Sequence, residues 1–100
     1  MTQEDKDIIL KKIDSLYGKV VKGGWDYMDG RDDALSKLRV FIIKMNATEK
    51  DMAQEEKDAI LKKIDKIYDD VVNDNQDYME GKDDALSALR VFVNNMNITQ

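Results

Sequence analysis

Between residues 26 and 41 the chain reads Asp26-Tyr27-Met28-Asp29-Gly30-Arg31-Asp32-Asp33-Ala34-Leu35-Ser36-Lys37-Leu38-Arg39-Val40-Phe41. Nearly the same stretch returns 51 positions later, from Asp77 to Phe92. Apolar residues in both stretches fall three or four positions apart, which is the spacing of an amphipathic helix. Each stretch also contains one glycine, Gly30 or Gly81, which we interpret as the turn between a first and a second helix.

The repetition extends over the whole chain. Residues 1–49 align with residues 52–100 without a gap, and 30 of the 49 positions are identical. This predicts a tandem duplication of a helical hairpin, whether natural or designed. Because only a few residues link the two copies, neighbouring helices should be antiparallel. The expected fold is all-α, an up-down-up-down four-helix bundle that forms a single domain over residues 1–100.

The first helix is expected from about residue 4 to 22. Thr2 followed by Asp5 is typical of an N-cap with an acidic residue three positions on. Residues 23–29 could be frayed or helical, and both alternatives stay open. Asp32 or Asp33 is expected to cap the second helix, and Thr48 with Asp51 the third. The apolar residues that predict the first helix are Ile9, Leu10, Ile13, Leu16, Tyr17, Val20 and Val21.

The composition excludes several classes of site. There is no cysteine and no histidine, so the usual zinc, haem and iron–sulfur sites, a cysteine nucleophile and histidine acid–base catalysis are excluded. The net charge is −5 without a basic stripe, which argues against nucleic-acid binding. No apolar run approaches the ~20 residues of a membrane span, and the polar first residues do not resemble a signal peptide. We expect a cytoplasmic protein without a cofactor.

Acidic residues around the two glycines could be metal ligands. If Gly30 stood at position 6 of an EF-hand loop, Trp25 and Tyr27 would occupy ligand positions 1 and 3, which they cannot serve. Helix capping is the simpler explanation. A metal-dependent enzyme that uses these carboxylates is the third functional hypothesis, and no catalytic or metal-binding residue is assigned. The carboxylates are Asp26, Asp29, Asp32 and Asp33, mirrored by Asp77, Glu80, Asp83 and Asp84.

The copies differ most between residues 18 and 25, a segment that is glycine-rich and locally basic. The equivalent segment of the second copy, residues 69–76, is acidic. The segment of the first copy holds the only tryptophan of the chain, and tryptophan beside basic residues is typical of a binding hot spot. The leading hypothesis is therefore a non-enzymatic interaction or regulatory module with an unknown protein partner. The alternative is drift in an exposed turn. The predicted binding patch consists of Lys19, Lys22, Gly23, Gly24, Trp25 and Tyr27.

The second helix of the first copy carries more apolar residues than one interface needs. Such a helix is either central in the bundle or buries a partner. The second functional hypothesis is therefore a structural, self-assembling or designed repeat protein, which forms homo-oligomers through Val40, Phe41 and Ile43. Arg39 and Arg90 recur beside the apolar stripe and are expected to bond to a neighbouring carboxylate or helix end.

Overall fold

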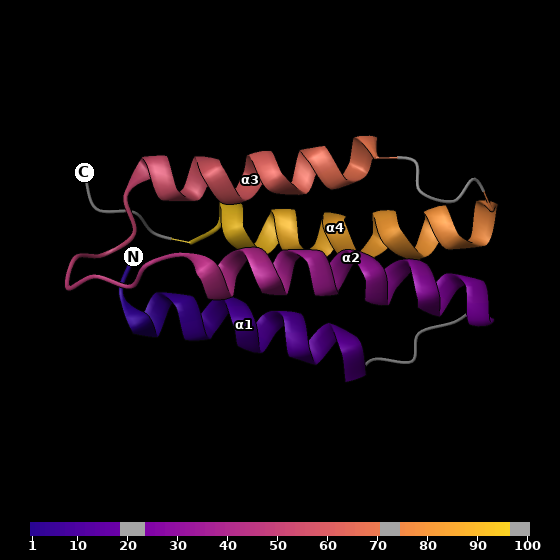
Figure 1. The fold of residues 1–100 in the computed structure, drawn as a ribbon, viewed down its shortest axis with the longest axis horizontal. Coiled ribbons are helices and arrows are strands. Elements are labelled where there is room, and N and C mark those ends of the chain that lie inside the picture. Colours follow the sequence, from indigo (N-terminus) through magenta and orange to yellow (C-terminus); the bar gives the residue numbers. More distant parts are fainter. Residues whose placement is uncertain (19–23, 71–74, 97–100) are drawn as a thin grey trace.

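The computed structural model describes residues 1–18, 24–70 and 75–96, and these residues form four α-helices and no strand. The helices are α1 (Gln3–Gly18), α2 (Trp25–Lys44), α3 (Gln54–Asp69) and α4 (Gln76–Asn94). Each helix runs antiparallel to the next along the chain (Figure 1). The predicted up-down-up-down four-helix bundle is confirmed. The origin of the two halves by duplication stays a prediction.

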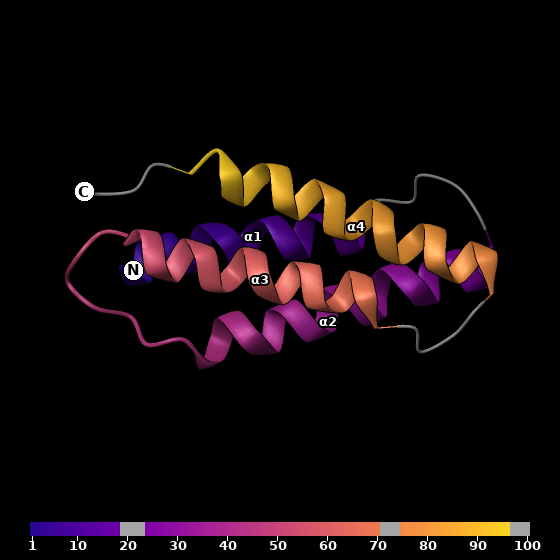
Figure 2. The same ribbon diagram turned by 90° about the horizontal axis from the view of Figure 1, so that it is seen from above.

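The helices α2 and α4 form the centre of the molecule and run in the same direction (Figure 1). The helix α1 lies on the outer side of α2, and α3 on the outer side of α4. Figure 2 shows that α2 and α4 are close together at their N-terminal ends and diverge toward their C-terminal ends. The outer helices pack against the diverging half, so the four-helix core lies there.

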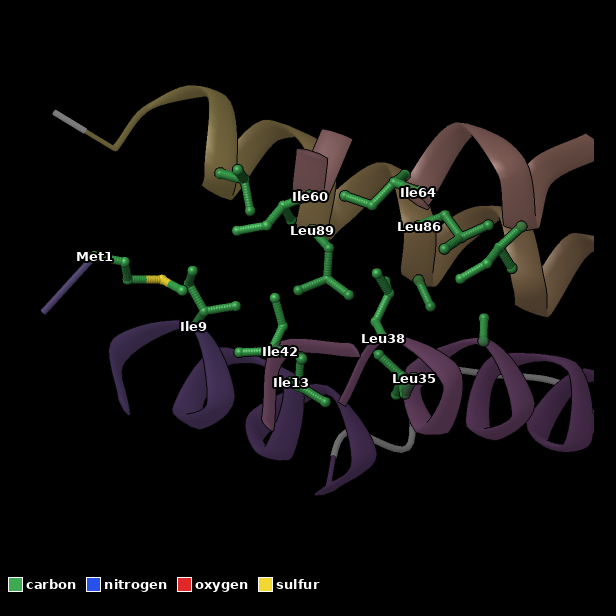
Figure 3. Close-up of a cluster of buried hydrophobic side chains, with 14 of the residues drawn as sticks. Met1, Ile9, Ile13, Leu35, Leu38, Ile42, Ile60, Ile64, Leu86 and Leu89 are labelled. Carbon is green, nitrogen blue, oxygen red and sulfur yellow. The ribbon is translucent and has the colours of Figure 1, made fainter. Parts of the chain in front are cut away.

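Aliphatic side chains fill this core (Figure 3). Two residues from each helix meet at its centre, without space for a water molecule between them. All of them are 0–1% exposed. Burying an aliphatic side chain of this size contributes about 1.5–3 kcal/mol relative to exposing it, so this cluster is the main source of stability. Its members are Ile9, Ile13, Leu38, Ile42, Ile60, Ile64, Leu89 and Val93.

The close approach of α2 and α4 depends on two glycines. A Cβ atom added to Gly30 would lie 1.9 Å from the carbonyl oxygen of Tyr78, and one added to Gly81 would lie 2.0 Å from the carbonyl oxygen of Tyr27. No side chain fits at such distances. The missing Cβ therefore lets the two backbones touch, and this contact fixes where the central helices cross.

Two hydrogen bonds between side chains lie on either side of the glycine contact. The Tyr27 hydroxyl donates to Asp84 Oδ2 at 2.7 Å, and the Tyr78 hydroxyl donates to Asp33 Oδ2 at 2.6 Å. Burial and the bonded carboxylate raise the pKa of both tyrosines to about 12. Tyrosine, glycine and aspartate at positions i, i+3 and i+6 of one helix thus meet the same three residue types of the other.

The prediction that Gly30 and Gly81 form turns is wrong, because both lie inside helices. The helix α2 starts at Trp25 and continues through Gly30 to Lys44, so Trp25–Asp29 are helical. Asp32 and Asp33 are consequently mid-helix residues and do not cap a helix. The apolar face that contains Ala34 and Leu38 begins at Tyr27, one turn before the glycine.

The other predicted helix ends had mixed outcomes. The cap at Thr2 is confirmed, since the Asp5 N–H donates to Thr2 Oγ1 at 3.0 Å and the Thr2 N–H donates to Asp5 Oδ2 at 3.2 Å. The cap at Thr48 is wrong, because α3 begins later and its N-cap residue is Ala53. There the Ala53 N–H donates to Glu56 Oε1 at 3.0 Å. The predicted end of the first helix, at residues 19–22, lies outside the described residues.

Buried cations tie each outer helix to its central helix. Arg31 of α2 and Lys82 of α4 are only 6% and 5% exposed. Arg31 Nη2 donates to the Tyr17 carbonyl oxygen at 3.1 Å, and Lys82 Nζ donates to the Tyr68 carbonyl oxygen at 3.1 Å. These carbonyl groups lie in the last turn of α1 and α3, where a helix lacks its own donors and carries partial negative charge. The cations therefore stabilise the ends of the outer helices.

A second pair of cations, both lysines, does the same at the opposite end. Lys6 Nζ donates to the carbonyl oxygens of Ile43 and Met45, at 2.7 and 2.9 Å, beside the end of α2. Lys57 Nζ donates to the carbonyl oxygens of Asn94 and Met96 beside the end of α4. Each hairpin is thus closed at both ends by a side chain that caps the neighbouring helix.

We expect Gly30→Ala to destabilise the protein by about 1–3 kcal/mol, because its methyl group would overlap the backbone of α4. At an ordinary helical position the same change stabilises by up to ~1 kcal/mol. The sign of the change in the free energy of unfolding, measured by urea unfolding, therefore tests the close contact. Gly24→Ala is the control, since no atom lies within 4 Å of an added Cβ there. An unchanged or increased stability of Gly30→Ala would contradict the crossing.

The tyrosine pair predicts a loss of stability at alkaline pH. The pKa of Tyr27 and Tyr78 is about 12 in the folded protein, against an ordinary value of 10.0. Below the unfolded pKa both states keep these protons and the hydrogen bonds contribute fully. As the pH rises toward the folded pKa, the unfolded chain loses its protons first, so the free energy of unfolding falls.

The measurement compares the wild-type chain with a Tyr27→Phe/Tyr78→Phe variant at a series of alkaline pH values. Lysine titration is common to both proteins and cancels in the difference. We expect the stability advantage of the wild-type chain to shrink through this pH range. A constant difference would show that the two hydroxyl groups ionise equally in the folded and unfolded states.

Candidate binding site at the tip of the bundle

The N-terminal ends of α2 and α4 meet at one end of the molecule (Figure 1). We call this region the tip and define it as residues 24–26 and 75–77. A hydrogen bond from Asn75 Nδ2 to Asp26 Oδ2, 3.3 Å long, joins its two halves. The tip extends beyond the ends of the outer helices in both views (Figures 1 and 2).

The two helix starts at the tip are built differently. In α4 the Asn75 side chain accepts hydrogen bonds from the N–H groups of Asp77 and Tyr78, at 2.9 and 3.2 Å. In α2 the corresponding residue is Gly24, which has an extended backbone and no side chain to cap the helix. The start of α2 therefore leaves backbone N–H groups without a side-chain cap.

Trp25 is the first residue of α2 and is 83% exposed. Of the large hydrophobic residues found exposed in the described part of the chain, it has the largest exposed fraction. In α4 the equivalent first residue is Gln76. A helix start of this kind therefore forms without an aromatic residue, and the packing of the bundle does not account for Trp25.

Carboxylates follow the exposed Trp25 along the first turns of α2. Asp26 follows Trp25 directly, and Asp29 stands one helical turn further on. Asp77 and Glu80 occupy the equivalent positions of α4. Acidic side chains near a helix N-terminus interact favourably with the helix dipole, so these residues stabilise the two helix starts. Asp26 and Asp77 give the tip a negative charge, and Asp29 and Glu80 add to it one turn further along the helices.

The residues of the predicted binding patch are placed differently from one another. Gly24 and Trp25 lie together at the tip. Tyr27 is only 5% exposed, and its hydroxyl points into the crossing with α4. Lys19, Lys22 and Gly23 lie outside the described residues.

The predicted self-association residues lie near the C-terminal end of α2. Val40 and Ile43 are 50% and 49% exposed. Phe41 is half-buried, and Lys63 Nζ lies 5.8 Å from the centre of its ring. The expected pairing of the recurring arginines is confirmed, since Arg39 Nη1 donates to Asp14 Oδ1 at 2.7 Å and Arg90 contacts the equivalent Asp65.

One surface feature escaped sequence reasoning. An open groove of ≈ 650 Å³ lies between α2 and α3, beside the ring of Phe41. Ala59 lines it, whereas the equivalent position of the first copy carries Ile8. The change from isoleucine to alanine was visible in the sequence. Its meaning depends on which helix faces residue 59, and the sequence pattern did not supply that.

Residues 1–18, 24–70 and 75–96 contain no group of three or more histidine, cysteine, aspartate or glutamate side chains placed to hold a metal ion. Within the same ranges no helix is long and apolar enough to cross a membrane. No family model, curated protein or solved structure matches the chain.

Proposed function

We propose that this protein is a non-enzymatic helical interaction or regulatory module, which binds a protein partner through Trp25 at the tip. Lys19 and Lys22, which precede Trp25 in the sequence, complete the binding patch with Gly23 and Gly24. The observation that carries the proposal is the 83% exposure of Trp25 at a helix start whose counterpart uses glutamine.

An exposed indole is a loss of stability for the free protein and a source of binding energy for a complex. Leaving a large aromatic side chain in water forgoes the burial energy that it could contribute. A partner that covers the ring gains this energy, and the indole N–H can donate one hydrogen bond. Tryptophan is enriched among the residues that dominate binding energy at protein interfaces. Because its counterpart Gln76 starts α4 without an aromatic ring, Trp25 is free to serve binding.

We expect Trp25→Gln to weaken partner binding by at least about tenfold, or ~1.4 kcal/mol. The stability of the protein should change by less than about 0.5 kcal/mol, because glutamine occupies the equivalent position of α4. A pull-down with the tagged chain from its native host identifies the partner. Calorimetric titration of the purified partner then gives the affinities of both proteins.

Gln76→Ala is the matched control, because it changes the same position of the other helix start. It should leave the affinity unchanged. Trp25 is the only tryptophan, so its fluorescence reports contact directly and should shift to shorter wavelength as the partner covers the ring. Equal binding by the wild-type chain and Trp25→Gln would contradict the proposal.

A second candidate function is self-assembly through Val40, Phe41 and Ile43. The observation that favours it is the half-exposed state of Val40 and Ile43, two branched aliphatic residues on the outer part of one helix. Burying such residues in a homo-oligomer would contribute about 1.5–3 kcal/mol for each side chain that becomes fully covered.

Size exclusion coupled to light scattering tests this candidate at tens of micromolar. We expect a mass above the 11.5 kDa of one chain, which Ile43→Asn reduces to the monomer mass. Asparagine is the residue at the equivalent position of α4, so the variant should fold. A monomer mass for the wild-type chain would rule the candidate out.

A further inference from the structure

The two hairpins, α1 with α2 and α3 with α4, contact each other through equivalent residues at the crossing. Tyr27 of the first hairpin donates to Asp84 of the second at 2.7 Å, and Tyr78 of the second donates to Asp33 of the first at 2.6 Å. Each central glycine faces the backbone of the tyrosine in the other hairpin. Each hairpin therefore both gives and receives the same set of contacts.

The same exchange of contacts occurs at the core end of the bundle. The backbone nitrogen of Met1 contacts Glu56 Oε1 of the second hairpin. The Met52 N–H, just before α3, donates to Asp5 Oδ2 of the first hairpin at 3.2 Å. Contacts in which residue i meets j and the equivalent of j meets the equivalent of i are typical of an interface between two copies of one subunit.

Each hairpin also caps its own helix ends. Arg31 bonds to Tyr17 within the first hairpin, and Lys82 bonds to Tyr68 within the second. Each hairpin contributes four of the eight aliphatic side chains in the central cluster. A hairpin without its counterpart would expose these four side chains to water and lose their burial energy. It therefore needs an opposite hairpin, and none of the contacts above depends on which chain supplies it.

The connection between the hairpins is suited to act as a hinge. Residues 46–51, between α2 and α3, are all exposed. Fully extended, a segment of this length spans roughly 20 Å. Opening it separates the two hairpins without unfolding either one, because these residues belong to no helix.

We propose that the crossing face of each hairpin also binds the opposite hairpin of a second copy of the chain, so that two chains exchange hairpins and form a swapped dimer. Such a dimer contains two four-helix bundles joined by two hinges, and it carries two tips with one Trp25 each. The short tether holds the hairpins of one chain at an effective concentration in the millimolar range. The closed monomer is therefore favoured at micromolar concentration, and the swapped dimer forms when the crossing within one chain is impaired.

A mixture of two full-length variants, Gly30→Leu and Gly81→Leu, tests this proposal. Either variant alone has a leucine in every crossing between opposite hairpins, where a Cβ atom already overlaps a backbone carbonyl group. A swapped pair with one chain of each kind places the unchanged Gly30 of one chain against the unchanged Gly81 of the other. Exchange of hairpins therefore restores one intact crossing, and no closed monomer of either variant can do so.

The two variants are mixed in denaturant and refolded together at tens of micromolar. We expect sedimentation to give twice the 11.5 kDa mass of one chain. The melting temperature of the mixture, followed by circular dichroism, should exceed that of either variant alone by at least about 4 °C, because one crossing is intact again. Gly30→Ala with Gly81→Ala repeats the test with a smaller side chain, in case the leucine chains do not fold.

The matched control mixes the double variant Gly30→Leu/Gly81→Leu with Gly81→Leu, a pair that contains no intact crossing in any arrangement of opposite hairpins. This mixture should keep the mass and melting temperature of its separate chains. If neither the leucine pair nor the alanine pair gains mass and melting temperature over the separate variants, the proposal is wrong. An equal gain by one variant alone would place the crossing between two identical hairpins and would also overturn it.

This proposal does not depend on the function of Trp25 or on self-assembly through Ile43. Trp25→Gln or Ile43→Asn, added to both chains of the mixture, should leave the gain in mass and melting temperature unchanged, because neither residue lies at the crossing. Loss of the gain with Ile43→Asn would assign the association to the end of α2 and not to exchanged hairpins.

Discussion

The close contacts of Gly30 with the Tyr78 backbone and of Gly81 with the Tyr27 backbone are the constraint on which the rest of the structure depends. An added Cβ atom at either glycine would lie within 2.0 Å of a carbonyl oxygen of the other helix, so the crossing point of α2 and α4 cannot shift without a loss of contact. Because the two helices touch there, they diverge toward their C-terminal ends (Figure 2). This divergence creates the space that α1 and α3 fill with isoleucine side chains. The N-terminal ends remain together and form the tip.

Polar side chains stabilise both the individual hairpins and the crossing between them. Arg31 and Lys82 bind the carbonyl groups at the ends of α1 and α3, and Lys6 and Lys57 bind those at the ends of α2 and α4. Each of these bonds joins the two helices of the same hairpin, two bonds in each hairpin. The tyrosine–aspartate bonds join the two hairpins. Arg31 also pairs with Asp32, whose Oδ1 lies 3.2 Å from its Nε, so this buried charge has both carbonyl and carboxylate partners.

Much of the fold could be predicted from local spacing, whereas the crossing could not. The 3–4 residue periodicity gave the helices, and Thr2 and Asp5 indicated the first cap correctly. Gly30 was misread as a turn because a glycine has the same sequence signature in a turn and in a close helix contact. The apolar residues Tyr27 and Met28, which continue the face of Ala34 and Leu38 beyond the glycine, were the signal for the correct interpretation. At the candidate site, comparison of the two copies singled out Trp25, which only the first copy carries. The groove beside Ala59 could not be predicted in this way, because it depends on where Phe41 lies in the fold.

The Tyr27–Asp84 hydrogen bond also has a consequence for how the chain folds. It joins residues 57 positions apart, whereas Arg31 reaches Tyr17 across only 14 positions. Closing the longer loop costs more chain entropy, so contacts within a hairpin should form before contacts between hairpins. The last step is then the docking of two preformed hairpins through a short tether, at an effective concentration in the millimolar range. In kinetic terms the protein resembles a dimerisation reaction carried out within a single chain.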